Sequence, residues 1–349
     1  MKLEAPFLPD AGYTARLAEL GDRLDSVHFA LPGSTALDAR QQPAPNERAT
    51  LDALQDLRGP DVFLLLNGRM LPPQRYLDSD AMAALAARLE RLVDEVGLRG
   101  IVIADFHLLN ALSEAAPETC SRLEAVPSVN TMIDAPAKAR AVLDVIAASA
   151  FRSPSRVVLD RSLNRNRDGL ARTADAVRKR LPGVAIVLLA NEGCLPHCPY
   201  KAAHDAHISL VSQRLCADRT FEANRRYACL SDFFERPERI LASPFIRPED
   251  AEWYQDHADV LKICGRTRGP EFLARAVGAY GAGRWDGNLL DLLDAVGDAA
   301  GRLSLDNAAL PDDFPTLMSG CELDCPGCGR CASMLATAFR RKTVALREF

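Results

Sequence analysis

The sequence has no long run of apolar residues. Hydrophobic residues make up 48% of its 349 residues, yet no stretch approaches the roughly 20 consecutive apolar residues that a membrane-spanning helix needs. The first residues, Met-Lys-Leu-Glu-Ala-Pro, also lack the apolar core of a secretory signal peptide. These absences predict a cytoplasmic protein without a membrane segment.

A surplus of positive charge is missing as well. The chain has 42 Lys and Arg residues against 47 Asp and Glu residues, for a formal net charge of -5. Proteins that bind nucleic acid without regard to its sequence depend on an excess of cations. The charge balance therefore argues against nucleic acid as a partner, without excluding it, and favours a small-molecule substrate.

Three signatures of familiar enzyme sites are absent from the sequence. It contains neither the Gly-x-Ser-x-Gly elbow of serine hydrolases nor the His-Glu-x-x-His motif of zinc peptidases. No glycine-rich turn follows the first predicted strand, so no dinucleotide site is predicted. The residues that could carry chemistry must be sought elsewhere.

Cysteines are abundant: there are ten, and six of them form two clusters. Thiolates spaced two or three residues apart can converge on one soft metal centre, and Gly and Pro between them allow tight turns. In a cytoplasm such clusters fit reduced metal ligands better than disulfides. The first cluster is Cys194 and Cys198, and the second is Cys321, Cys325, Cys328 and Cys331.

Short apolar runs alternate with amphipathic segments along most of the chain. Segments such as Asp80–Gly97 repeat their apolar residues at three- and four-residue spacing, which is typical of helices. Apolar strands separated by helices indicate a parallel sheet buried on both faces. We predict an α/β fold, a (β/α)8 TIM-like barrel that can be irregular, with a doubly wound open sheet as the alternative. The predicted strands are Ser26–Leu31, Val62–Gly68, Gly100–Asp105, Leu123–Val129, Arg156–Asp160, Val184–Ala190, Arg239–Ser243 and Asp259–Cys264.

The pattern changes after residue 300. A linker rich in Asp and Pro, Asp306–Pro315, leads to the second cysteine cluster and a basic terminal helix. We predict two parts: residues 1–299 form the barrel domain with the first cysteine site, and residues 300–349 form a small cysteine-rich C-terminal appendage.

Polar residues gather where the predicted strands end. Asp105 closes the third strand, Arg161 follows the fifth, and Cys264 and Arg266 follow the eighth. Each of them alone is more often a helix cap or a satisfied loop residue. Because the carboxyl ends of barrel strands form the active-site mouth, their joint position predicts a site there.

The segment Asn191-Glu-Gly-Cys-Leu-Pro-His-Cys-Pro-Tyr200 resembles the collagenase-like peptidase family, peptidase family U32. The likeness continues through Lys201–His207, Ser243–Asp250 and Leu261–Arg268, and it covers roughly residues 20 to 295. The resemblance implies a barrel-shaped protein with a [4Fe–4S] cluster on cysteines. Several members are oxygen-independent hydroxylases of ubiquinone precursors or RNA bases, with prephenate implicated as a hydroxyl donor. Quinone-hydroxylating members work as pairs, which implies a homo- or hetero-oligomer with a related subunit.

The first cysteine pair needs two further thiolates to hold a cubane cluster. Cys229 precedes the seventh predicted strand, and we predict it as the third ligand. The fourth ligand is Cys264, Cys216 or a cysteine of the tail, and Cys264 can instead be a small buried hydrophobe. The three-residue gap between Cys194 and Cys198 departs from the quinone-hydroxylating members.

The second cluster has ligand spacings closer to ferredoxin-like iron–sulfur runs than to zinc knuckles, which are separated by a long loop. A second [4Fe–4S] centre is therefore predicted at Cys321, Cys325, Cys328 and Cys331. The alternative is a zinc ion that stiffens the tail.

Two histidines and several arginines complete the candidate site. A His pair three residues apart on one helix face can donate protons or orient a carboxylate, or simply lie on the surface. Guanidinium groups on mouth loops suit a carboxylate such as that of a prephenate-like donor, or form salt bridges with nearby acids. The catalytic candidates are His204, His207, Arg266 and Asp105. The candidates for binding the donor are Arg161, Arg247 and Arg268.

These patterns and the resemblance together favour an iron–sulfur-dependent, oxygen-independent oxidoreductase, in the first instance a hydroxylase of a small molecule or modified precursor. A U32-type peptidase is one alternative, although a peptidase needs an activated nucleophile or a metal-bound water. A non-catalytic iron–sulfur partner subunit is another. The metal content of the protein would distinguish these functions, because one cluster, two clusters or zinc alone would each be compatible with a different one.

Overall fold

Eight parallel strands form one sheet in a computed structural model that describes residues 1–31, 37–40 and 46–342. The strand order is β5-β4-β3-β2-β1-β8-β7-β6. At the remaining gap, the amide of Ala125 donates to the carbonyl of Arg152 at 3.3 Å, next to β6. The sheet is thus nearly closed, which confirms the predicted TIM-like α/β barrel. The strands are β1 (Lys2–Pro6), β2 (Leu24–Phe29), β3 (Asp61–Leu66), β4 (Leu98–Ile103), β5 (Glu124–Pro127), β6 (Arg156–Val158), β7 (Ala185–Leu189) and β8 (Val260–Lys262).

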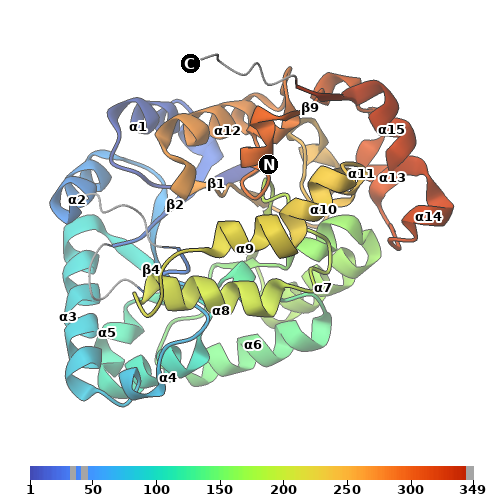
Figure 1. Ribbon diagram of the computed structural model, residues 1–349. Coiled ribbons are helices and arrows are strands. Elements are labelled where there is room, and N and C mark those ends of the chain that lie inside the picture. The colour runs from blue at the N-terminus through green and yellow to red at the C-terminus, as the bar shows by residue number, and fades with distance from the viewer. Residues whose placement is uncertain (32–36, 41–45, 343–349) are drawn as a thin grey trace.

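Helices connect the strands and cover the outside of the barrel (Figure 1). The longest, α3, begins after the N-cap Asp78 and ends at Gly97, which has a left-handed φ of 64°. Its buried residues, such as Leu85 and Leu89, recur at helical spacing and face the sheet. The covering helices are α1 (Ala11–Ala18), α2 (Glu47–Asp56), α3 (Ser79–Val96), α4 (Phe106–Ala115), α5 (Pro117–Ser121), α6 (Pro136–Ala148), α7 (Arg167–Arg180) and α12 (Pro270–Ala282).

The predicted strand Arg239–Ser243 is wrong, because this segment is helix α11 (Glu238–Ala242). Its apolar residues Ile240 and Leu241 are buried in a core beside the barrel. A short apolar run fits one turn of a buried helix as well as it fits a strand, and periodicity alone does not separate the two.

The strand missing from the prediction is β1, at the amino terminus. Leu3 and Ala5 face the covering helices, but the charged Glu4 between them interrupts the apolar pattern. Glu4 points into the barrel and is only 2% exposed, because it pairs there with Lys262 of β8. Because one residue of a buried ion pair lies in β1, this central strand of the sheet lacks the continuous apolar run by which the other strands were predicted.

The inside of the barrel is half apolar and half charged. Small apolar side chains from six strands fill one part, whereas Arg156 lies over the ring of Phe63 at 4.5 Å and pairs with Asp25 at 2.6 Å and Asp61 at 3.0 Å. The apolar layer consists of Phe63, Leu65, Val102, Val126, Val158, Val187 and Val260.

The long connection between β7 and β8 contains four helices. Helices α8 and α9 pack together and lie across the barrel, whereas α10 and α11 lead toward the C-terminal helices (Figure 1). None of the helices in the described ranges is both long and apolar enough to span a membrane. The four are α8 (Lys201–Ser212), α9 (Thr220–Tyr227), α10 (Cys229–Glu235) and α11.

The C-terminal segment packs beside the barrel around a second hydrophobic core. This core joins residues on both sides of position 299, such as Phe245 and Phe314, whose rings stack at 5.7 Å. The predicted division at residue 299 stays a prediction. The terminal helix ends at Ala338, and Arg340 and Arg341 belong to a short strand. The elements are β9 (Leu303–Leu305), α13 (Phe314–Met318), α14 (Cys325–Cys328), α15 (Arg330–Ala338) and β10 (Phe339–Arg341).

Candidate active site at the barrel mouth

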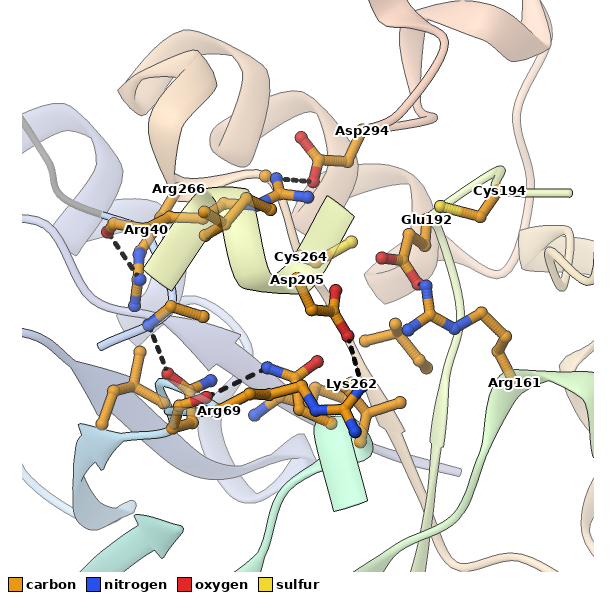
Figure 2. A pocket seen from close by; sticks show the side chains of 18 of the residues that line it. Arg40, Arg69, Arg161, Glu192, Cys194, Asp205, Lys262, Cys264, Arg266 and Asp294 are labelled. Atoms are coloured by element: carbon orange, nitrogen blue, oxygen red, sulfur yellow. Dashed lines mark hydrogen bonds and ion pairs between the residues drawn. The ribbon is translucent and has the colours of Figure 1, made fainter. Parts of the chain in front are cut away.

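A cavity of about 120 Å³ lies at the carboxyl ends of the barrel strands. Its walls include Pro6 at the end of β1, His28 of β2, Leu65 of β3, Leu189 of β7 and Lys262 of β8. Helix α8 closes one side, and Figure 2 shows side chains from these separate elements converging on the same space. The position matches the active-site mouth expected of a barrel.

Cationic side chains dominate the lining of the mouth cavity. Three carboxylates share the lining with them, and each pairs with a cation there: Asp294 with Arg40 at 2.6 Å, Asp205 with Arg69 at 2.9 Å, and Glu192 with Arg161. The excess of cations favours an anionic ligand. The cationic residues are Arg40, Arg69, Arg161, Lys201, Lys262 and Arg266.

Two of these cations have their carboxylate partners behind them, outside the lining. Lys262 pairs with Glu4, and Arg266 pairs with Asp38; each of these carboxylates is 2% exposed. Burial lowers the pKa of Lys262 and of Arg266. The Nε of Arg266 is a buried donor without a hydrogen-bond partner in the described part of the chain.

His28 and His204 both face the cavity as neutral rings. Burial, followed by the charge of Lys262, lowers the pKa of His28 to about 4, and its Nδ1 lies 3.2 Å from Lys262 Nζ. Burial, followed by the charge of Arg40, lowers the pKa of His204 to about 4. A neutral imidazole at this position can accept a proton during a reaction.

Cys194 and Cys264 bring two thiols to the cavity wall. Burial raises the pKa of both thiols, and Asp294 adds to the rise at Cys264. The Cys264 Sγ donates to Asn191 Oδ1 at 3.2 Å. Without a bound cation, both side chains are therefore protonated thiols at neutral pH.

The other predicted ligands of the first site lie close by. Cys229 contributes to the raised pKa of Cys194, and Cys198 contributes to that of Cys229, which burial raises to about 11. These three thiols are the donor set that an iron–sulfur cluster or zinc prefers. As the side chains stand, no group of three or more His, Cys, Asp or Glu residues in the described ranges has metal-holding geometry. Ligation would require the thiols to rotate toward one another.

The structure gathers only some of the predicted site residues at the cavity. Arg161, Arg266 and His204 line it, whereas His207, one helical turn further along α8, is exposed. Asp105 caps α4 by accepting from the amides of His107 and Leu108, and it also accepts from the Tyr76 hydroxyl. A catalytic role for Asp105 or His207 stays a prediction.

Two predicted donor-binding arginines also lie outside the lining. Arg247 donates to both carboxylate oxygens of Asp250, at 2.8 and 2.7 Å, and to the carbonyl of Pro311 at 3.0 Å. Arg268 lies over the ring of Phe272 at 5.2 Å. In this structure Arg247 joins the linker to the barrel, and donor binding by either arginine stays a prediction.

The sequence analysis did not select several residues that line the cavity, above all Lys262, His28 and Arg40. Lys262 could have been found from the sequence because it interrupts the apolar run Val260–Ile263. A buried strand tolerates a lysine only when its charge is paired. His28 likewise interrupts the apolar residues of its strand, between Val27 and Phe29. Arg40 lies in a loop with no local pattern, so only the fold reveals its position.

Comparisons with known proteins agree with this architecture. An uncharacterised protease of Methanocaldococcus jannaschii, MJ1657, is 33% identical over 187 residues, which are 53% of this chain and 54% of the relative. The chain thus matches about half the length of this curated relative. No protein-family profile matches the chain.

A solved structure, that of the U32 peptidase Mk0906, superposes with a TM-score of 0.50 and covers 75% of this chain and 92% of its own. At 18% identity it bears on the fold alone. The sequence match to a protease bears out the predicted resemblance to a peptidase family, and the fold match shows that the chain shares its architecture with a U32 peptidase.

Proposed function

We propose that the mouth cavity is the active site of an oxygen-independent oxidoreductase, in the simplest case a hydroxylase, that binds a small carboxylate-bearing molecule. The observation that carries the substrate class is the pair Lys262 and Arg266. Both cations line the cavity, while Glu4 and Asp38 neutralise them from behind. A carboxylate in the cavity can accept from the N–H groups with which both cations line it.

The remaining lining supports this role. Ion pairs such as Arg161 with Glu192 and Arg40 with Asp294 hold the cationic side chains in place before a ligand arrives. The small volume of the cavity limits the water that can enter with a substrate. His204 has a neutral ring, so it can accept a proton from a bound molecule.

The redox centre in this proposal is an iron–sulfur cluster on Cys194, Cys198 and Cys229. Such a cluster supplies electron transfer or Lewis-acid chemistry when it is bound. The fourth thiolate would come from Cys264, Cys216 or the tail. Cys264 would have to give up its hydrogen bond to Asn191.

Two measurements test the proposal. Anaerobically purified protein should contain iron and acid-labile sulfide and absorb broadly near ~400 nm. Arg266→Gln should weaken the binding of succinate, used as a probe, by about tenfold or more, because one charge-assisted bond contributes about 1.5–3 kcal/mol. The matched control is Arg284→Gln, since Arg284 is exposed and its salt bridge is with the exposed Asp286. Zinc alone in the protein would contradict the redox centre, and unchanged succinate affinity would contradict the carboxylate site.

The second candidate function is peptide-bond hydrolysis, which the names of both relatives favour. A thiol peptidase needs a cysteine activated by a base. In the described residues no hydrogen bond joins a cysteine to a histidine, and burial raises the pKa of Cys194. Peptide cleavage by metal-free protein, abolished by Cys194→Ala and retained by Cys216→Ser, would support hydrolysis and contradict the oxidoreductase.

A further inference from the structure

The second cysteine cluster belongs to a segment that is fastened at both ends. Just before it, the amide of Gly320 donates to the carbonyl of Arg165 at 2.7 Å. The Arg165 guanidinium is buried next to the stacked rings of Phe245 and Phe314, with its central carbon 5.0 and 5.3 Å from the two ring centroids. The segment therefore leaves the barrel from a rigid point.

The far end of the segment is fixed as well. Helix α15 buries Leu335 and Ala338 in the second core. After it, β10 pairs antiparallel with β9, and the amide of Asp306 donates to the carbonyl of Ala338 at 2.8 Å. Figure 1 shows α14 projecting beyond α13 and α15 at the edge of the molecule.

Between these points, Cys321, Leu323 and Cys331 pack partly buried against the second core, but no described residue of the segment 321–331 is fully buried. Apart from its cysteines, its apolar side chains are one Leu and one Pro. Leu323 adopts a left-handed φ of 63°, which is uncommon for a residue with a side chain. Local bonds, such as Cys328 N to Asp324 O at 3.1 Å, form only the single turn of α14. Segments too small to bury a core usually depend on a disulfide or a metal.

The four thiols of the segment lie within eleven residues of sequence, and in the described residues no three of them are already arranged to hold a metal. Cys325 and Cys328 are three residues apart on the turn of α14, so their side chains project from the same face. Cys321 and Cys331 both pack against the second core. All ten cysteines of the chain are free thiols, so no disulfide crosslinks the segment.

A cavity of about 240 Å³ lies between this segment and the cysteine motif at the barrel mouth. Pro196 and His197 of the mouth motif line it from one side, and Cys321 and Leu323 line it from the other. The two cysteine regions are thus neighbours that face a common space, each on its own section of backbone.

We propose that Cys321, Cys325, Cys328 and Cys331 bind one soft, thiolate-seeking metal centre that crosslinks the segment 321–331 and is separate from the cysteines of the barrel mouth. Four thiolates suit either a [4Fe–4S] cluster or a zinc ion. The metal supplies the crosslink that the segment lacks, because its binding free energy becomes local folding free energy. This site does not depend on the reaction proposed for the mouth.

The test measures metal content in the full-length protein. Anaerobic samples are loaded with ferrous iron and sulfide in one arm and with zinc chloride in the other, and each is desalted before analysis. Cys328→Ser should lower the content by about four irons and four sulfides per chain in the first arm, or by about one zinc in the second. Cys194→Ala should keep the metal of the tail, and Cys216→Ser, an exposed cysteine outside both clusters, should match the wild type.

A second readout follows the segment itself. Arg330 is exposed and lies inside it, so trypsin should cut there at least about tenfold faster in Cys328→Ser than in the loaded wild type. Wild-type metal content in Cys328→Ser, or loss of the tail's metal in Cys194→Ala, would overturn the proposal. Neither readout uses enzyme activity, so an inactive mouth with a loaded tail would refute the proposed function and not this site.

Discussion

The two cysteine regions of this protein differ in what holds their shape. Cys194 follows a buried strand, and the Asn191 side chain near it bonds to the backbone of Cys264 at 2.8 and 3.1 Å. Cys328, in contrast, is exposed on a single helical turn between two fastened ends. Folding of the barrel fixes the backbone that carries the thiols at the mouth, whereas in our proposal a bound metal positions those of the tail.

This difference follows from how each region uses charge and burial. At the mouth, Glu4 and Lys262 come from adjacent strands and are almost fully removed from water. Such a buried ion pair is compatible with the folded protein only when both charges are present, because removing one leaves the other buried and unpaired, which is strongly destabilising. The segment 321–331 contains no comparable buried pair in the described residues. Four experiments test the contrast.

The largest effect is expected for Glu4→Gln. It leaves Lys262 buried beside a neutral amide, so the free energy of unfolding should fall by about 3–5 kcal/mol. Urea unfolding measures the change. Asp286→Asn is the control, because its partner Arg284 is 69% exposed and the pair should contribute almost nothing. A loss below about 1 kcal/mol in Glu4→Gln would mean that the buried charges do not support the mouth.

Acid should weaken the mouth before it affects the carboxylates. His28 has a pKa of about 4 in the folded protein, against about 6.5 unfolded, so the unfolded chain takes up the proton first as the pH falls. Stability contributed by a neutral His28 is complete above pH 6.5 and is lost as the pH falls toward 4. Between pH 7.5 and pH 5 His28 alone should account for a loss of about 2 kcal/mol, and His204, whose pKa is also lowered to about 4, should add to it.

The slope of unfolding free energy against pH identifies the source of this loss. His28→Gln should make the slope between pH 5 and pH 6.5 shallower, and His204 accounts for part of the slope that remains. Glu4 has a lowered pKa, and its contribution is lost only below pH 4.5. An unchanged slope in His28→Gln would contradict the burial of this ring.

A smaller effect is expected where the tail docks on the barrel. The Trp253 Nε1 donates to Thr316 Oγ1 at 3.1 Å on the protein surface. Thr316→Val removes the acceptor and should cost about 0.5–1 kcal/mol. Hydrogen exchange should increase around α13 and stay unchanged in β2 and β3. An equal increase in the barrel strands would mean that the tail and the barrel unfold as one unit.

The smallest effect is expected at His207. It is exposed on α8, whereas His204 lines the cavity. His207→Gln should change succinate affinity by less than about twofold, and His204→Gln should change it more. Isothermal titration of the two variants checks this, and a larger effect at His207 would restore the predicted histidine pair.

Much of the barrel could be predicted because its signal is local. Seven of the eight predicted strands overlap observed strands, since buried parallel strands are continuous apolar runs. Arg239–Ser243 was wrong because one buried helical turn has the same composition. Strand β1 was not predicted because Glu4 interrupts its apolar pattern. The lysine that pairs with Glu4, Lys262, is 258 residues away in the sequence, so no local pattern shows that this charge is buried.

The cysteine clusters and the family resemblance are also local, since ligand spacing and the Cys194 motif are properties of short segments. The identity of the cavity-lining cations is not. Arg40 and Lys262 line the same cavity only because β1 lies between β2 and β8 in the nearly closed sheet. The spacing of cysteines along a chain can identify candidate metal ligands. The charge of a side chain, in contrast, depends on its burial and on its ion-pair partners, and the fold fixes burial and partners only when distant strands come together.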